Sequence, residues 1–259
     1  MKLPETFIPG KKLENKVEDL LKKKEDEQIG LVIAVEDSTK ADRGMIYAWE
    51  PSMGKPKLVK IRKDMVMDFC YFDNKLYDCG AYTKITNTIT DEELLIKTLS
   101  VFSMCSYQNT PVYSNLGVIY LGDSKARERL GWIFALRAHN GRLYDAGSEK
   151  KIFTTIKNDV IAARDDVVRA LCSHKGDLYD AGHYGAVFNT YNGEMIAERA
   201  HIIYALCSFK GMLLEGGTSG MVTDCFGDKV LFDFGYNTVT AIEAIPLSLV
   251  KELIRFENT

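Results

Sequence analysis

The chain has 259 residues, 46% of them hydrophobic, and carries a formal net charge of −3 with an isoelectric point near 5.9. A length of this order suits a single repeat-built or all-β domain, and the apolar share is sufficient to bury a core. Because phosphate-rich partners favour basic proteins, this charge balance argues against nucleic acid and against an anionic membrane surface.

We expect neither a membrane span nor a signal peptide. No apolar run approaches the roughly 18 residues of a membrane-spanning helix, and the first residues lack the order of a signal peptide. The six cysteines form no C-x-x-C pair, which argues against a zinc knuckle and a redox motif. We therefore expect a soluble, cytoplasmic protein with reduced thiols.

The first expected element is a helix within Lys11 to Glu27. This segment is highly charged, and Leu13, Val17, Leu20 and Leu21 recur at helical spacing. We predict a short helix that caps the fold, with a partner-binding helix as the alternative.

Three strands are expected next. The segment GLVIAVEDS from Gly30 reads as one strand, and GMIYAWEPSMGKPKLVKIRKDMVMDFC from Gly44 supplies two more before a new unit begins. The loop between them, Glu36 to Gly44, contains three carboxylates that could hold a hard cation. Its spacing fits no EF-hand loop, so a solvated turn is favoured.

A repeated unit follows. The segments IFALRAHNGRLYDAG from Ile133, VRALCSHKGDLYDAG from Val168 and IYALCSFKGMLLEGG from Ile203 are spaced 35 residues apart. Further copies begin at Val66, with VMDFCYFDNKLYDCG, and at Val101, with the degenerate VFSMCSYQNTPVYSN. A near-constant period of this length indicates a repeat architecture.

Each unit reads as four short strands. In the unit from Val168 the strands are V-R-A-L-C, D-L-Y-D-A-G, A-V-F-N-T and E-M-I-A-E-R-A, separated by turn signals. Four strands without a helical pattern are typical of a propeller blade.

The segment TVTAIEAIP at Thr238 looks like the missing first strand of the N-terminal blade. Together with the five units, this shared blade predicts an all-β, six-bladed β-propeller of four-stranded blades. Its C-terminal strand completes the N-terminal blade and leaves no open edge. A short helix is expected from Leu247 to Phe256. The expected division is residues 1–28 as an N-terminal helical extension, 29–246 as the propeller and 247–259 as a C-terminal helix and tail.

From Ile29 to Pro246 the chain resembles the β-propeller repeat superfamily. It lacks the Trp-Asp of a WD40 repeat, since Trp49 and Trp132 are its only tryptophans. The Asp-Ala-Gly and Glu-Gly-Gly segments resemble kelch repeats, although the unit is shorter than the kelch period of about 50 residues. The superfamily resemblance implies a rigid disc with a central channel and one loop-rich face.

Residues repeated in every blade are interpreted as structural. Acidic residues of the second strand recur as Asp78, Asp145, Asp180 and Glu215, in step with Arg62, Arg129, Arg164 and Arg199. We predict ion pairs between strands or adjacent blades rather than a metal site or acid–base chemistry. Cys70, Cys105, Cys172 and Cys207 share one position, held by Arg137 and Glu243 in the other blades. We interpret these cysteines as small buried hydrophobes rather than zinc ligands.

Candidate binding residues are expected in the loops that connect strands two and three and in those that join successive blades, because loops on a rigid scaffold usually carry binding. These residues are Tyr82, Glu149, Arg164, Asp165, Asp166, His183, Tyr184, Arg199 and His201.

Two functions remain open. The first is a non-catalytic scaffold that binds a protein or peptide on the loop-rich face, without cofactor or metal. It is favoured because the chain has no G-x-S-x-G motif and only four histidines. The second is a metal-dependent enzyme with lactonase-, lyase- or cyclotransferase-like chemistry at the channel mouth. Six-bladed relatives with such activities imply a polar residue from several blades at the axis. The residues that would have to converge are Glu36, Asp64, Asp68, Glu243, His183 and His201.

Overall fold

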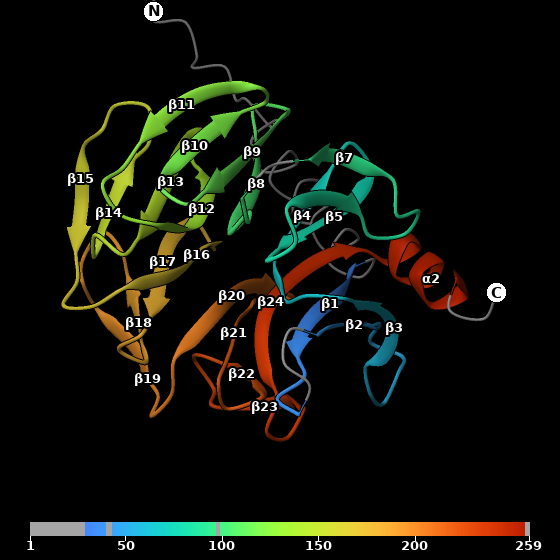
Figure 1. The fold of residues 1–259 in the computed structure, drawn as a ribbon. Helices are drawn as coiled ribbons and strands as arrows, with labels where there is room; N and C mark the ends of the chain where they lie inside the picture. Colours follow the sequence, from blue (N-terminus) through green and yellow to red (C-terminus); the bar gives the residue numbers. More distant parts are fainter. Residues whose placement is uncertain (1–28, 40–42, 97–98, 257–259) are drawn as a thin grey trace, which may run out of the picture.

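The computed structural model describes residues 29–39, 43–96 and 99–256, which form six four-stranded antiparallel sheets arranged in a ring (Figure 1). The expected helix within Lys11 to Glu27 lies outside the described residues. The division of the chain into three parts stays a prediction.

The ring is closed by a blade that joins the two ends of the propeller. Strand β24 (Thr238–Pro246) is its innermost strand and pairs with β1 (Ile29–Glu36), followed outward by β2 (Gly44–Trp49) and β3 (Lys57–Arg62). The predicted closure is thus confirmed.

The other five blades each follow the chain from the channel outward. Their strands are β4 (Val66–Phe72), β5 (Lys75–Gly80), β6 (Lys84–Asn87) and β7 (Glu93–Ile96); β8 (Ser103–Tyr107), β9 (Thr110–Asn115), β10 (Val118–Leu121) and β11 (Ser124–Glu128); β12 (Ile133–His139), β13 (Arg142–Gly147), β14 (Lys151–Thr154) and β15 (Val160–Ala163); β16 (Val168–His174), β17 (Asp177–Gly182), β18 (Ala186–Asn189) and β19 (Met195–Glu198); and β20 (Ile203–Phe209), β21 (Met212–Gly217), β22 (Met221–Asp224) and β23 (Val230–Asp233). The innermost strands contact one another in the ring order β24, β4, β8, β12, β16 and β20.

The hydrophobic core is divided among the interfaces between neighbouring blades. Between the last two blades, for example, Cys172 and Tyr179 pack against Leu206 and Leu213. Alternate strand residues point toward one neighbouring blade or the other, which is why both faces of each sheet are apolar.

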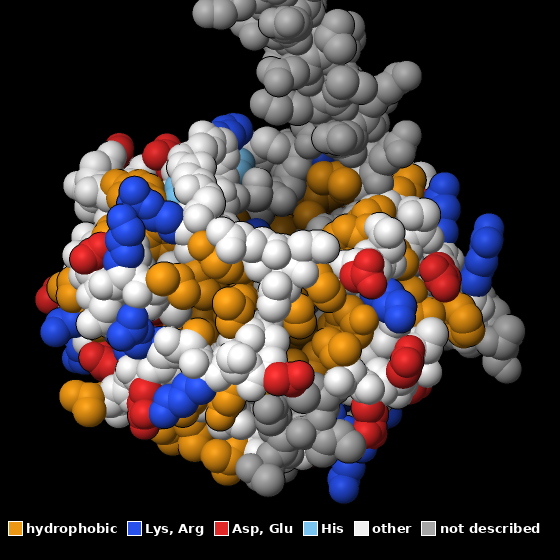
Figure 2. Space-filling model, turned by 90° about the horizontal axis from the view of Figure 1, so that it is seen from above, with side chains coloured by type: hydrophobic (Ala, Val, Ile, Leu, Met, Phe, Trp, Pro, Cys, Tyr) orange, Lys and Arg blue, Asp and Glu red, His pale blue; other side chains and the backbone are white. Residues whose placement is uncertain are grey.

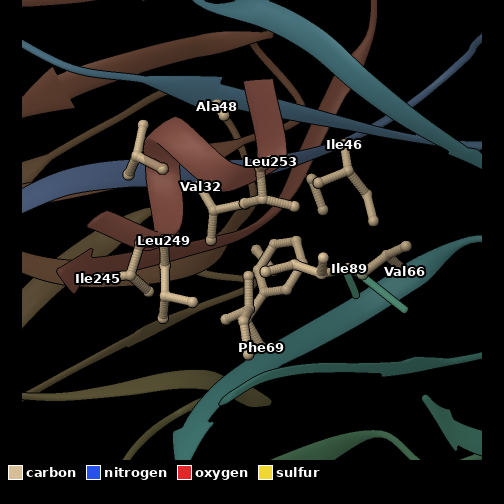
Figure 3. Close-up of a cluster of buried hydrophobic side chains, with 13 residues drawn as sticks. Val32, Ile46, Ala48, Val66, Phe69, Ile89, Ile245, Leu249 and Leu253 are labelled. Carbon is tan, nitrogen blue, oxygen red and sulfur yellow. The ribbon is translucent and has the colours of Figure 1, made fainter. Parts of the chain in front are cut away.

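Helix α2 (Leu247–Phe256) follows β24 directly and covers the closing blade. Its Leu249 and Leu253 point toward Val32, Ile46 and other buried side chains (Figure 3). The predicted C-terminal helix therefore packs against the blade in which the chain closes.

Candidate functional site

Four buried carboxylates are each bound by an arginine of the preceding blade. Arg164 follows β15, and its Nε and Nη2 both donate to Asp180 of β17 at 2.7 Å. The same arrangement joins Arg62 to Asp78, Arg129 to Asp145 and Arg199 to Glu215. These repeated pairs therefore connect adjacent blades, as predicted.

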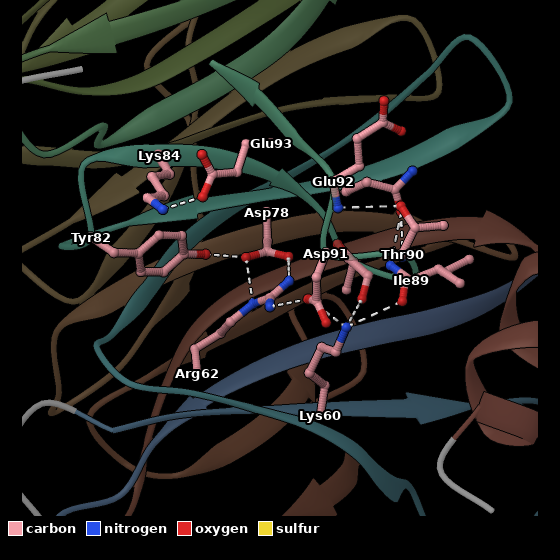
Figure 4. A network of polar contacts seen from close by, with 12 residues as sticks. Lys60, Arg62, Asp78, Tyr82, Lys84, Ile89, Thr90, Asp91, Glu92 and Glu93 are labelled. Carbon is pink, nitrogen blue, oxygen red and sulfur yellow. Dashed lines mark hydrogen bonds and ion pairs between the residues drawn. The ribbon is translucent and has the colours of Figure 1, made fainter. Parts of the chain in front are cut away.

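Hydroxyl groups also donate to three of these carboxylates, Asp78, Asp145 and Asp180. Asp180 also accepts hydrogen bonds from Tyr184 at 2.9 Å and from Thr190 at 2.9 Å. In the first copy, the hydroxyl of Tyr82 and the guanidinium of Arg62 converge on Asp78 (Figure 4). The candidate residues Tyr82, Arg164 and Tyr184 thus all bind these buried carboxylates.

The acidic candidates lie in loops of the same face, Glu149 between β13 and β14 and Asp165 and Asp166 between β15 and β16. The side chain of Glu149 accepts a hydrogen bond from the backbone N–H of Leu130 at 3.0 Å, and that of Asp166 accepts one from Val167 at 2.7 Å. Asp165 is exposed, and its carbonyl oxygen accepts a hydrogen bond from Lys150. The side chains of Glu149 and Asp166 thus accept hydrogen bonds from the backbone of different loops.

Two candidates from adjacent blades do meet. His183 and His201 line one shallow cleft of about 420 Å³, together with Tyr184 and Arg199. Nε2 of His201 lies 3.3 Å from Oε2 of the buried Glu215, whereas Nε2 of His183 accepts a hydrogen bond from Arg169. Burial, and next to it Arg169, lowers the pKa of His183.

A β-bulge sits at the start of five innermost strands and determines what lines the channel mouth. In the fifth blade Val168 pairs with Gly182 and Ala170 with Ala181, so that Arg169 is an extra, unpaired residue. The glycine is required there, because a Cβ on Gly182 would overlap the carbonyl oxygen of Val167. A bulge redirects its extra side chain.

The residues at this second position of the innermost strands form a ring that lines a pocket of about 290 Å³ at the mouth. They are Met67, Phe134, Arg169, Tyr204 and Thr240, joined by Phe102, which directly precedes β8. Glu36, Met65, Trp132 and Thr238 complete the lining. We refer to this cavity as the mouth pocket.

One side of the mouth pocket is a continuous aromatic wall. Phe102 stacks on Trp132 with ring centroids 5.6 Å apart, and both meet the ring of Phe134. The guanidinium of Arg169 lies 3.8 Å from the centroid of Phe134 and 5.4 Å from that of Tyr204. The wall therefore ends in a cation held between two rings.

Deeper in the channel, an ion pair crosses from one blade to the opposite blade. Nη1 of Arg137 in β12 lies 3.7 Å from Oε2 of Glu243 in β24. Burial raises the pKa of Glu243 to about 7, against the influence of Arg137. Burial also raises the pKa of Asp68, another channel residue, to about 6.

The four equivalent cysteines are buried beside this ion pair, and all six cysteines are free thiols. Burial raises the pKa of Cys172 to about 11 and that of Cys105 to about 12, so both are protonated at neutral pH. In the part of the chain that the structure describes, no group of three His, Cys, Asp or Glu side chains is arranged to hold a metal ion.

The residues required by the metalloenzyme hypothesis lie in separate places. Asp68 and Glu243 line the channel, Glu36 lines the mouth pocket, and His183 and His201 line the shallow cleft. Asp64 lies in the loop between β3 and β4.

The face of the molecule shown in Figure 2 carries charges of both signs. On the face shown in Figure 2, basic and acidic side chains are interspersed with hydrophobic ones. Across residues 29–39, 43–96 and 99–256, no helix has both the length and the apolarity of a membrane span.

Sequence reasoning missed the mouth pocket, although a signal was present. The second position of the innermost strand varies in every blade, whereas the flanking Val or Ile and the small third residue recur. This variable column in a regular repeat contains the aromatic residues and Arg169 of the mouth pocket.

Comparison with known proteins supports the fold. No family model and no curated protein matches the chain. Among solved structures, the WD40 β-propeller domain of Doa1 is similar, with a TM-score of 0.55, 12% identity, and coverage of 84% of this chain and 86% of that one. The computationally designed Ika8 protein matches with a TM-score of 0.47 and 16% identity over 81% of this chain and 76% of that chain. The WD40 likeness is one of fold, and the chain is a six-bladed β-propeller.

Proposed function

We propose that this propeller is a non-catalytic scaffold that binds a peptide segment of a protein partner over the mouth pocket. The observation that carries this proposal is the aromatic wall at the channel mouth. Such a wall on a rigid ring provides apolar area at little cost in conformational entropy.

The surroundings of the mouth pocket support a protein partner. Loops that join successive blades on this face expose large apolar side chains, which are Leu99, Leu130, Trp132 and Tyr236. The side chains of Leu130 and Tyr236 are fully exposed. Exposed apolar groups around a pocket are a common feature of protein-binding faces.

The candidate loop residues Glu149, Asp165, Asp166 and His201 lie on the same loop-rich face and would form the rim of this interface. The six free thiols agree with action in a reducing compartment such as the cytosol. The partner class is proposed as protein or peptide, not nucleic acid or membrane.

A displayed library of random dodecapeptides tests the function. The full chain is immobilised beside a Trp132→Ala, Phe134→Ala variant and a control variant, Ile156→Ala, whose half-exposed side chain lies in a loop on the opposite face. We expect peptides enriched on the wild type and the control to be lost on the mouth variant. Enrichment that survives the mouth variant would place binding elsewhere and refute the proposal.

A further inference from the structure

The polar groups of the mouth pocket indicate which peptides it selects, an inference that rests on the proposed scaffold function. Arg169 is the one cation in the pocket lining, and it is half-buried. Within the described residues its Nε donates a hydrogen bond to Nε2 of His183 at 2.9 Å, and it binds no carboxylate.

This arginine differs from the four arginines between the blades. Each of those binds a buried carboxylate, as Arg164 binds Asp180. Arg169 instead lies between the faces of Phe134 and Tyr204. Stacking uses the faces of the guanidinium and leaves the in-plane N–H groups of its two terminal nitrogens directed outward, where a carboxylate can bind both.

Burial lowers the pKa of Arg169, as expected for a cation that lacks a carboxylate partner. A partly buried cation without a counter-ion costs free energy, which an anionic ligand would recover. Arg169 therefore favours an anionic ligand in the mouth pocket.

A second polar group in the same pocket lacks a partner. Oγ1 of Thr240 is buried and makes no hydrogen bond among the described residues. Thr240 is itself the extra residue of a bulge, between Val239 and Ala241 in the pairing of β24 with β1. A ligand amide or carboxyl group could satisfy this hydroxyl.

The size of the pocket limits what can enter. A volume of about 290 Å³ lies at the lower end of small-molecule sites, so it holds one or two side chains rather than a folded surface. We infer that the mouth pocket binds an acidic side chain next to a bulky apolar one in a peptide segment of a partner protein. The apolar side chain packs on the wall of Phe102, Trp132 and Phe134, and the carboxylate binds Arg169.

The test compares the peptides that a random dodecapeptide library yields on the full wild-type chain and on Arg169→Gln. A matched control, Arg142→Gln, removes the same charge from an exposed residue at the start of β13, on the opposite face. On the wild type and the control we expect Asp or Glu within two positions of Phe, Trp, Leu or Met. On Arg169→Gln the acidic preference should disappear while the apolar one remains.

Affinity measurements then quantify the contact. For the most enriched peptide, made synthetically, replacing its acidic residue by the amide should weaken binding to the wild type at least tenfold and binding to Arg169→Gln less than twofold. Arg169→Lys should retain only part of the affinity, because it keeps the charge without the two-pronged donor. Thr240→Val, of the same shape, should weaken binding severalfold.

The outcomes separate this inference from the proposed function. Peptides that depend on Trp132 and Phe134 but show no acidic preference would support the proposed scaffold function and refute the binding of a carboxylate by Arg169. A preference for basic peptides would do the same. Absence of any peptide that depends on the mouth residues would refute both. As a control for folding, the thermal unfolding of each variant is measured, and a transition near the wild-type temperature indicates that the fold is retained.

Discussion

At the scale of single residues, the buried carboxylates connect the blades. Asp180 is fully buried and accepts four hydrogen bonds, two from Arg164 and one each from Tyr184 and Thr190. Because the shell is complete, the cost of burying the charge is offset by charged hydrogen bonds. Such a pair stabilises the fold only while both partners are present, since removing either one leaves a buried charge unpaired.

Removing one partner of this pair should therefore be costly. We expect Asp180→Ala to lower the free energy of unfolding by about 3–5 kcal/mol, because Arg164 is left without its carboxylate. Denaturant unfolding measures this loss. The control is Glu128→Ala, which breaks the exposed pair with Lys125 and should cost less than about 1 kcal/mol. Equal losses in the two variants would contradict the structural role of the pair.

The ion pair in the channel makes stability depend on pH. Arg137, Asp68 and the thiols of Cys70, Cys172 and Cys207 influence or surround Glu243. Burial raises the pKa of Glu243 from its usual value near 4.5 to about 7, so the folded state binds the proton more tightly than the unfolded state. The stability that this proton provides is complete below about pH 4.5 and is lost as pH rises toward 7.

Glu243→Gln imitates the protonated side chain and should remove this dependence. Relative to the wild type, the variant should gain stability between pH 5 and pH 8, and the difference should level off above the folded pKa. Chemical unfolding at several pH values measures the difference, with Asp68→Asn showing a similar trend centred near pH 6 or below. A difference that is constant with pH would refute the raised pKa.

At the scale of secondary-structure elements, the bulge at the start of five innermost strands links packing to the mouth pocket. The glycine at the end of the second strand allows its backbone to lie close to the start of the first strand. Gly147 lies in this way against Trp132, and Gly182 against Val167. The extra residue then points into the mouth. The close approach of the two strands thus explains why the Asp-Ala-Gly segments of the repeat end in glycine.

A side chain at this glycine should disturb the blade. We expect Gly182→Ala to lower the free energy of unfolding by about 1–3 kcal/mol, as overpacking does. The variant should also weaken peptide binding through Arg169, which lies in the same bulge. Gly54→Ala, with no heavy atom within 4 Å of the added Cβ, is the control and should change stability by less than about 0.5 kcal/mol. Unchanged stability of Gly182→Ala would refute the close approach.

The sequence predicted the elements well because their signals are local. Alternating strands, turn residues and the 35-residue spacing are visible in each copy, and the structure confirms six four-stranded blades closed by β24. The bulge was not predicted, because an extra residue appears only once the pairing of two strands is known. The candidate site therefore shifted from the loops, where Glu149 and His183 lie, toward the ring that contains Arg169.

The same reasoning explains the mixed result for the candidate residues. Arg164 and Arg199 are near loops, which favoured binding, yet they also recur in step with buried acids, which favoured a structural role. The structure shows their ion pairs with Asp180 and Glu215, and a role in binding stays a prediction. A repeat that shares one residue type at one position indicates packing, and departure from the repeat indicates a site.

At the scale of the whole molecule, the ring depends on one strand. Strand β24 pairs along all of β1 and contacts β20 and β4 on its two sides. Without it the closing blade loses its innermost strand, and β1 exposes an unpaired edge.

A chain that ends at Asn237 should therefore fail to form the closed ring. We expect its thermal unfolding to lose cooperativity and its size-exclusion profile to shift to larger species, because exposed edges pair between molecules. A synthetic peptide of residues 238–256 added in trans should partly restore the wild-type transition. The control is a chain that ends at Phe256 and keeps both β24 and α2. A cooperative transition of the short chain at the wild-type temperature would show that closure is dispensable.

The pairing of β1 with β24 also has a consequence during protein synthesis. About 200 residues separate the two strands, so at about 5–20 residues per second a ribosome needs about 10–40 s to make the second strand after the first. During that interval β1 has no inner partner, while blades made in between can already assemble. The blades of the nascent chain therefore form an open arc, and the ring closes last, when β24 pairs with β1.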